Sequence, residues 1–208
     1  MLFSEIKTRV KRQFGDESGA LIDDLDITRW ANDGQVDIIR KTDALMSLQS
    51  TAVTLGTTSV TLPTDFLFAK KIVMNQIPLE LVSFSEGFIT STVYSQNSAP
   101  GTCYVWNNKL YFNGEQASGS VQLYYNRRPA ALVIDSDIPE VPVQMHEDIV
   151  RFCIARAKEL NEDMEGAGII MSDYNQRVNL ARSEVNSPDS NSYNAIRTLP
   201  GDGGNEYW

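Results

Sequence analysis

The sequence has few of the residues that usually carry chemistry: only two cysteines and one histidine among 208 residues. The histidine, His146, opens the segment HEDIV, which has no second histidine four residues on and therefore fails the zincin pattern. No G-x-S-x-G elbow is present to suggest a Ser-His-Asp triad. We expect His146 to cap a helix or to lie at an interface, and we expect neither a metal nor a cofactor.

The cysteines are also too few for a secreted disulfide scaffold. Cys103 and Cys153 lie far apart in segments of different type, whereas small secreted domains use more cysteines. We predict two reduced, buried thiols. The glycines at 201, 203 and 204 lack the strand, helix and lysine of a phosphate-binding loop, so no nucleotide site is indicated.

Long apolar runs are absent as well. The longest, such as Ala130–Ile134, are far too short to span a bilayer. Residues 1–14 alternate apolar and basic side chains at helical spacing and lack the continuous apolar core of a signal peptide. We expect no membrane segment and no signal peptide.

Positive charge is scarce, and the formal net charge is −9. This balance argues against a protein that wraps nucleic acid, because such proteins need a basic surface to release counterions. It remains compatible with a channel through which DNA slides, since an acidic wall repels phosphate.

Apolar residues recur at helical spacing in four stretches. Their members are Phe3, Ile6, Val10 and Phe14; Ile27, Trp30, Ala31, Gly34 and Ile38; Ile149, Cys153, Ala157 and Leu160; and Ile170, Met171, Tyr174, Val178 and Ala181. The second helix has a candidate N-cap at Asp23, Asp24 or Asp26, because a carboxylate there accepts free backbone N–H groups.

From about Thr51 to Tyr125 the spacing becomes typical of strands. We predict seven short strands in a small antiparallel module. Hairpins are predicted around 56–58, around 75–78 and at the pair Asn107-Asn108, whose side chains suit the positive backbone angles of a tight turn.

The predicted fold class is α+β. It consists of a four-helix bundle-like body, with two N-terminal and two C-terminal helices, and an inserted small antiparallel β module. The proposed divisions are N-terminal helices at 1–50, the β module at 51–128, C-terminal helices at 129–186 and an extended arm at 187–208.

The arm is rich in Ser, Asn, Gly, Asp and Pro and cannot bury enough apolar surface to fold alone. It nevertheless carries five spaced apolar anchors, which suggest that it orders on a partner. The anchors are Tyr193, Ile196, Leu199, Tyr207 and Trp208. The alternative is an ordinary frayed terminus.

Acidic clusters provide the remaining enzymatic alternative. Residues 23–26, 135–137 and 162–165 each contain carboxylates that could serve as the acid and base of a glycan hydrolase. All three lie where capping and solvation also favour acidic residues. The basic pairs Lys70-Lys71 and Arg127-Arg128 are isolated, and we interpret such pairs as salt-bridge or interface residues.

Several segments in their order resemble the tailed-bacteriophage head-to-tail adaptor, or connector, family. They are DITRWANDGQVDIIRKT, VTLPTDF, SAPGTCYVWNNKLYF and VQLYYNRRPAALVIDSDIPEVPVQMHEDIVRFCIARA, followed by a helix ending near Arg182. The more specific elements are LP-x-DF and the D-x-D-x-P-x-x-P-x-x-x-H-x-x-[IV]-V run.

The resemblance implies a non-enzymatic virion protein of the phage neck, assembled in the host cytoplasm. Its expected partners are the portal protein, a tail tube or nozzle protein, and further copies in a dodecameric ring, with the arm bound to the portal. Genomic DNA would pass through during packaging and ejection without sequence-specific binding. Arg127, Arg128 and His146 are candidate residues of a subunit or neighbour interface.

Two other functions stay open at this point. One is a tail-associated peptidoglycan hydrolase, which a zymogram with cell wall would detect. The other is a tail-completion or stopper protein of the same neck, which would bind the tail tube rather than the portal.

Overall fold

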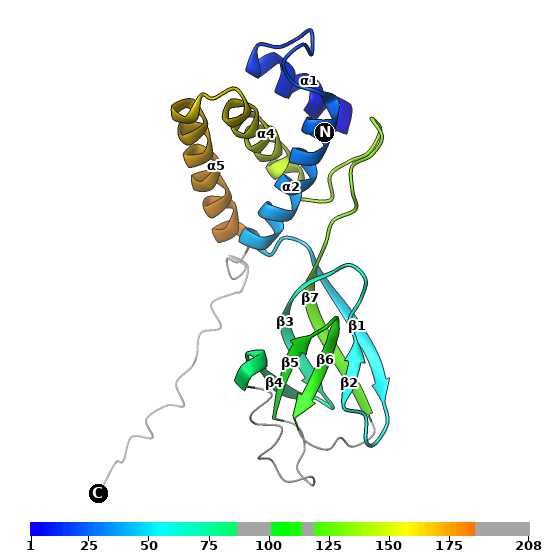
Figure 1. Cartoon of the computed structure of the whole chain (residues 1–208). Helices are drawn as coiled ribbons and strands as arrows, with labels where there is room; N and C mark the ends of the chain where they lie inside the picture. Colours follow the sequence, from blue (N-terminus) through cyan, green and yellow to red (C-terminus); the bar gives the residue numbers. More distant parts are fainter. Residues whose placement is uncertain (87–100, 114–118, 186–208) are drawn as a thin grey trace, which may run out of the picture.

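The computed structural model describes residues 1–86, 101–113 and 119–185 (Figure 1). In these ranges the chain forms helices at both ends and a sheet between them. The helices are α1 (Phe3–Phe14), α2 (Asp24–Thr42), the 3-10 helix η1 (Val143–Met145), α4 (His146–Leu160) and α5 (Met164–Val185). The strands are β1 (Met46–Val53), β2 (Ser59–Thr61), β3 (Phe66–Met74), β4 (Ile77–Leu81), β5 (Thr102–Trp106), β6 (Lys109–Asn113) and β7 (Gly119–Arg127).

The helices gather around α4, which packs against α1, α2 and α5. The predicted apolar stripes supply this core, and Phe3, Ile6 and Val10 of α1 are completely buried. Gly34 allows α2 to lie close to α4, because a Cβ there would come within 3.2 Å of the Phe152 ring. Asp23 is the N-cap of α2 and accepts a hydrogen bond from the Leu25 amide at 3.3 Å.

The strands form one seven-stranded sheet in the order β1-β7-β3-β4-β5-β6-β2. β1 and β2 occupy opposite edges, yet they are joined by residues 54–58 alone. A connection this short brings the two edges together at that end, so the sheet curls into a nearly closed barrel. Its core is separate from the helical one and is built from residues of the strands and of the segments between them, such as Leu62, Ile72, Leu110 and Leu123.

The prediction of a four-helix bundle-like body with a small antiparallel β module is wrong. The sheet is a seven-stranded, barrel-like region with its own core, and β4 pairs with β5 in parallel. The helical region also contains η1 and a long non-helical segment that contributes Leu132 and Val141 to the core. Helical and strand periodicity identify single elements, but they do not determine which elements pair or pack.

The predicted hairpins had different outcomes. Those around residues 75–78 and Asn107-Asn108 are confirmed: β3 pairs with β4, β5 pairs with β6, and Asn107 and Asn108 have φ of 46° and 57°. The hairpin around residues 56–58 is wrong, because β1 pairs with β7 and β2 pairs with β6. The turn residues are present, but β1 and β2 each pair with a strand from later in the chain instead of with each other.

Both cysteines are free and buried, as predicted, and each lies in a different core. Burial raises the pKa of the Cys103 thiol to about 12 and raises the pKa of the Cys153 thiol as well. Thiols of this kind are protonated and unreactive at neutral pH.

The two regions meet at a polar junction. Asp43, in the left-handed conformation at φ 61°, ends α2 and accepts a hydrogen bond from Asn126 of β7 at 2.7 Å. Its other carboxylate oxygen is 2.6 Å from Lys70 of β3. Asn126 is completely buried, so these contacts fix the start of β1 against the end of β7.

Candidate interaction surface

Residues 128–142, which we call the strap, connect the end of β7 to η1 and α4 and contain neither helix nor strand. Pro129, Pro139 and Pro142 lie within it. Proline lacks a backbone N–H and fits poorly in helix interiors or central strands, which explains why this segment stays irregular. In Figure 1 the strap runs beside α2 and the start of α1.

The strap is attached to α2 by side-chain amides. Asn32 donates to the Leu132 carbonyl at 3.1 Å and accepts from the Leu132 amide at 2.8 Å. Gln35 accepts from the Glu140 amide at 3.2 Å. Leu132, with 2% of its surface exposed, is thereby held in the helical core. Two polar residues on one face of α2 therefore bind an irregular segment as a neighbouring strand would.

The start of α1 is attached to the strap in the same way. The Phe3 and Ser4 amides, which have no partner within the helix, donate to the carbonyls of Asp137 and Asp135 at 2.8 and 3.1 Å. Lys7 lies 2.7 Å from the Asp135 carboxylate and 3.8 Å from Asp24.

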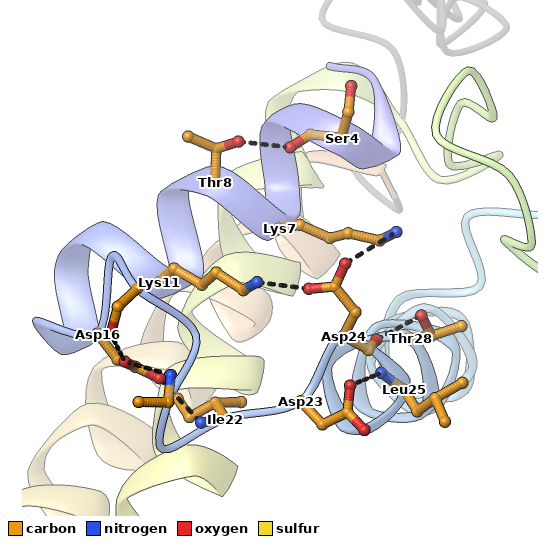
Figure 2. Close-up of polar contacts among 12 residues, drawn as sticks. Ser4, Lys7, Thr8, Lys11, Asp16, Ile22, Asp23, Asp24, Leu25 and Thr28 are labelled. Atoms are coloured by element: carbon orange, nitrogen blue, oxygen red, sulfur yellow. Dashed lines mark hydrogen bonds and ion pairs between the residues drawn. The ribbon is translucent and has the colours of Figure 1, made fainter.

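Asp24 also connects α1 to α2, since its carboxylate lies 2.6 Å from Lys11 (Figure 2). The hydrogen bond from Lys11 lowers the pKa of the Asp24 carboxyl. Figure 2 also shows Asp16 in the loop between these helices. Burial raises the pKa of Asp16, but hydrogen bonds from the Leu21, Ile22 and Ala20 amides and from the Ser18 hydroxyl leave it below 3.8.

The tip of the strap is a tight turn closed by Asp137. Its carboxylate accepts from the Val133 and Ile134 amides at 2.6 and 2.8 Å, and these bonds lower its pKa. The turn presents Val133, Ile134 and Ile138 to solvent, with 71%, 59% and 60% of their surfaces exposed. A turn held this firmly displays an apolar surface at little entropic cost on binding.

Arg127 precedes the strap and makes its contacts within the chain. Its guanidinium makes two hydrogen bonds to the Glu140 carboxylate, at 2.9 and 3.0 Å, and this contact lowers the pKa of Glu140. Arg128 is exposed, and its amide donates to the Asp65 carbonyl at 2.6 Å. No ion pair to the Arg128 side chain occurs among the described residues.

His146 lies at the other end of the strap and is 2% exposed. Nε2 is 2.9 Å from the Val141 carbonyl and must donate, so Nδ1 is free to accept from the Met1 amino group at 3.1 Å. Burial and the nearby amino group lower the pKa of His146, which keeps the ring neutral. In the single subunit His146 is therefore an internal residue, and the expected interface role of all three residues stays a prediction.

The acidic clusters considered for catalysis have structural contacts. Asp163 pairs with Lys158 at 2.6 Å and accepts from the Gly166 amide at 2.9 Å, and the clusters at 23–26 and 135–137 hold α1, α2 and the strap as described above. Among residues 1–86, 101–113 and 119–185, no group of three or more His, Cys, Asp or Glu side chains could hold a metal ion.

The exposed strap tip is not among the residues that the sequence predicted as functional. The apolar run Ala130–Ile134 was visible, but it follows neither the helical nor the strand period. The available signal was an apolar run between two prolines that follows neither the helical nor the strand period. The predicted arm anchors Tyr193, Ile196, Leu199, Tyr207 and Trp208 lie outside the described residues.

Within the described part of the chain, no helix is both long and apolar enough to cross a bilayer. A comparison with curated proteins gives no match. The family model of the SU10 adaptor protein matches residues 1–198, which confirms the resemblance drawn from the sequence motifs. The chain therefore belongs to the SU10 adaptor protein family, a family of phage head-to-tail adaptors and structural components of the virion neck.

Proposed function

We propose that this protein forms a ring that joins the portal to the tail and extends the channel through which DNA passes. The observation that carries the proposal is the match to the adaptor family over residues 1–198. The ring is a dodecamer that assembles in the host cytoplasm and contacts a tail tube or nozzle protein on its far side.

The distribution of charge supports a channel wall made from the helical region. Residues 46–127, which contain the whole sheet, carry four basic and four acidic side chains and are formally neutral. The net charge of −9 therefore resides entirely in the residues before and after the sheet. An acidic wall repels phosphate and lets DNA slide, whereas a basic wall would hold it.

The contacts of the acidic clusters favour a structural protein over an enzyme. We expect no lysis of cell wall by the wild-type protein or by a variant with Asp135 and Asp137 replaced by Asn, although the strap of the variant should be looser. A zymogram with purified cell wall measures lysis by both proteins. Reproducible wall lysis by the wild-type protein that disappears in this variant would favour the hydrolase.

The portal contact is assigned to residues 187–208 and their anchors Tyr193, Ile196, Leu199, Tyr207 and Trp208. Burying one such side chain contributes about 1.5–3 kcal/mol, while ordering each backbone residue costs about 1–2 kcal/mol. The arm therefore needs additional backbone hydrogen bonds or aromatic pockets, which a partner can provide by strand addition or in a groove. Trp208 should contribute most, since buried aromatics dominate such interfaces.

The test compares the intact chain with a chain lacking residues 187–208 and with the Trp208→Ala variant. Binding to purified portal is measured by biolayer interferometry, and thermal unfolding of each free protein serves as the folding control. The truncation should abolish portal binding and leave the unfolding temperature nearly unchanged, with Trp208→Ala in between. Equal binding by the truncated chain would indicate that the portal binds the helical region. Binding to the tail tube but not to the portal would indicate a stopper protein.

A further inference from the structure

β1 is an edge strand with an inverted pattern of side chains. Three of its four inward positions are polar: Ser47, Gln49 and Thr51 lie opposite Tyr125, Leu123 and Val121 of the sheet core, and only the last inward residue, Val53, is itself part of that core. The outward positions are Met46, Leu48, Ser50 and Ala52, and Met46 and Leu48 have 67% and 52% of their surfaces exposed. Large apolar residues at the start of this strand thus point away from the core, which favours their burial by another surface.

β1 also carries no charge that would oppose burial of its outer side. Its eight residues, MSLQSTAV, include neither a charged residue nor a proline. The register with β7 runs without a bulge from Met46 to Val53. We call the outward side chains Met46, Leu48 and Tyr124 the aliphatic face; Tyr124 lies directly opposite Leu48.

A second exposed apolar surface lies on the outside of β5. Trp106 has 49% of its surface exposed and stacks on Phe84 at a centroid distance of 5.4 Å. Tyr111 of β6 lies 6.0 Å from Trp106 and stacks on Tyr104 at 5.2 Å. We call these four rings the aromatic face; Tyr104 is itself only 8% exposed, so the other three rings provide its exposed surface. Their mutual stacking orders them before any partner binds, which lowers the entropic cost of binding.

The two faces lie on opposite sides of the barrel. In the sheet order, β7, β3 and β4 separate β1 from β5 on one side, and β6 and β2 separate them on the other. One molecule thus carries two different exposed apolar faces across from each other. Head-to-tail contacts between copies, which generate rings, require this arrangement.

Charges beside the two faces are complementary. Lys71 lies opposite Tyr124 and so shares the outer side of the aliphatic face. Glu80 lies opposite Thr102 and shares the outer side of β5 with the aromatic face. The sheet region is formally neutral, so it is the part of this −9 chain where copies meet with the least like-charge repulsion.

We propose that the aliphatic face of one copy packs against the aromatic face of a second copy of this chain. The proposal rests on the ring assigned under the proposed function and names the surfaces that close it. Each copy uses both faces, one toward each neighbour, and the helical regions remain free to line the channel.

The test uses the purified full-length chain at high salt, which screens the repulsion between copies. Sedimentation equilibrium measures self-association of the wild type and of the Leu48→Glu, Trp106→Lys and double variants. The matched control is Leu55→Glu, because Leu55 is 72% exposed but lies in the β1–β2 connection, outside both faces. Circular dichroism melts confirm that each variant folds.

Leu48→Glu and Trp106→Lys should each weaken self-association by about tenfold or more, because Leu48→Glu meets the aromatic face beside Glu80 and Trp106→Lys meets the aliphatic face beside Lys71. The double variant should recover most of this loss, since every contact then joins a glutamate to a lysine. Leu55→Glu should behave as the wild type. The proposal is overturned if the wild type does not associate, if Leu48→Glu associates as well as the wild type, or if the double variant shows no recovery.

Portal capture is measured separately on the wild type, so the two proposals can fail independently. Face-dependent self-association without portal capture would contradict only the portal contact. If the wild type captures portal but substitutions in the two faces leave self-association unchanged, only the interface proposed above is contradicted.

Discussion

The helical region and the sheet region of this subunit are held together by different means. Backbone ladders join the seven strands of the nearly closed sheet, and its core is formed by residues of the strands and of the segments between them. The helical region instead relies on side chains that bind an irregular segment: Asn32, Gln35 and Lys7 hold the strap, and the strap contributes Leu132 and Val141 to the core. A long loop can therefore be held as firmly as a strand when side chains form hydrogen bonds with its backbone N–H and C=O groups.

The regions also differ in charge. In each ion pair among the described residues the carboxylate lies in the helices, at their ends or in the strap, although Lys70 of β3 and Arg127 of β7 provide two of the cations. The carboxyls of lowered pKa lie outside the sheet as well, including Asp16, Asp24, Asp137 and Glu140. The sheet is formally neutral and exposes apolar faces. Under the proposed function, the first region would form the acidic channel wall and the second would contact protein.

The largest expected effects come from core truncations that separate the regions. Ile149→Ala in the helical core and Leu123→Ala in the sheet core should each cost about 2–5 kcal/mol, the usual loss for a buried aliphatic side chain. Because the cores are distinct, Ile149→Ala should speed amide exchange in the helices, and Leu123→Ala should speed it in the sheet. Hydrogen exchange with peptide resolution measures both. If either variant destabilises both regions equally, the chain folds as one cooperative unit and the comparison fails.

The junction is the next most sensitive place. Asp43→Ala removes the acceptor for the completely buried Asn126 amide and the partner of Lys70, so a loss of about 1–3 kcal/mol is expected. Asp43→Asn is the matched control, because it keeps an acceptor and tolerates the left-handed backbone. Chemical denaturation compares the two variants. Equal stability of Asp43→Ala and the wild type would mean that the junction adds nothing to the fold.

Acid should weaken the helical region before the sheet. The folded-state pKa of His146 is lowered, so the unfolded chain binds a proton first and stability falls as pH drops below about 6.5. A second loss follows below about 3.8, where Asp16, Asp24 and Asp137, whose folded pKa values are lowered, become protonated. Hydrogen exchange at stepwise lower pH measures the order. The same profile in a His146→Gln variant would show that the first step belongs to another group.

The smallest expected effect concerns the strap. Arg127→Lys keeps the charge but loses the paired hydrogen bonds to Glu140, which should cost about 0.5–1 kcal/mol for a partly exposed pair. Exchange of the amides at 130–134 should become faster, while the sheet stays unchanged. Arg128→Lys is the control, since the Arg128 side chain is exposed. A change in the sheet but not in the strap would contradict the role given to Arg127.

The sequence by itself determined the helices, most of the turns and the family. The stripe of Phe3, Ile6 and Val10, the N-cap at Asp23 and the turn at Asn107-Asn108 depend on neighbours in the chain, and local physics suffices to predict them. The order of motifs identified the adaptor family, because motif order needs no spatial information.

Only the tertiary structure decided how these elements combine. Three features depend on residues more than sixty positions apart: the pairing of β1 with β7, the near closure of the barrel and the separation of the cores. Local periodicity gives no information about contacts at that separation. The same holds for the candidate surfaces. The sequence showed Leu48, Trp106 and Val133 as ordinary apolar residues, and their exposure follows from strand register and from the turn closed by Asp137.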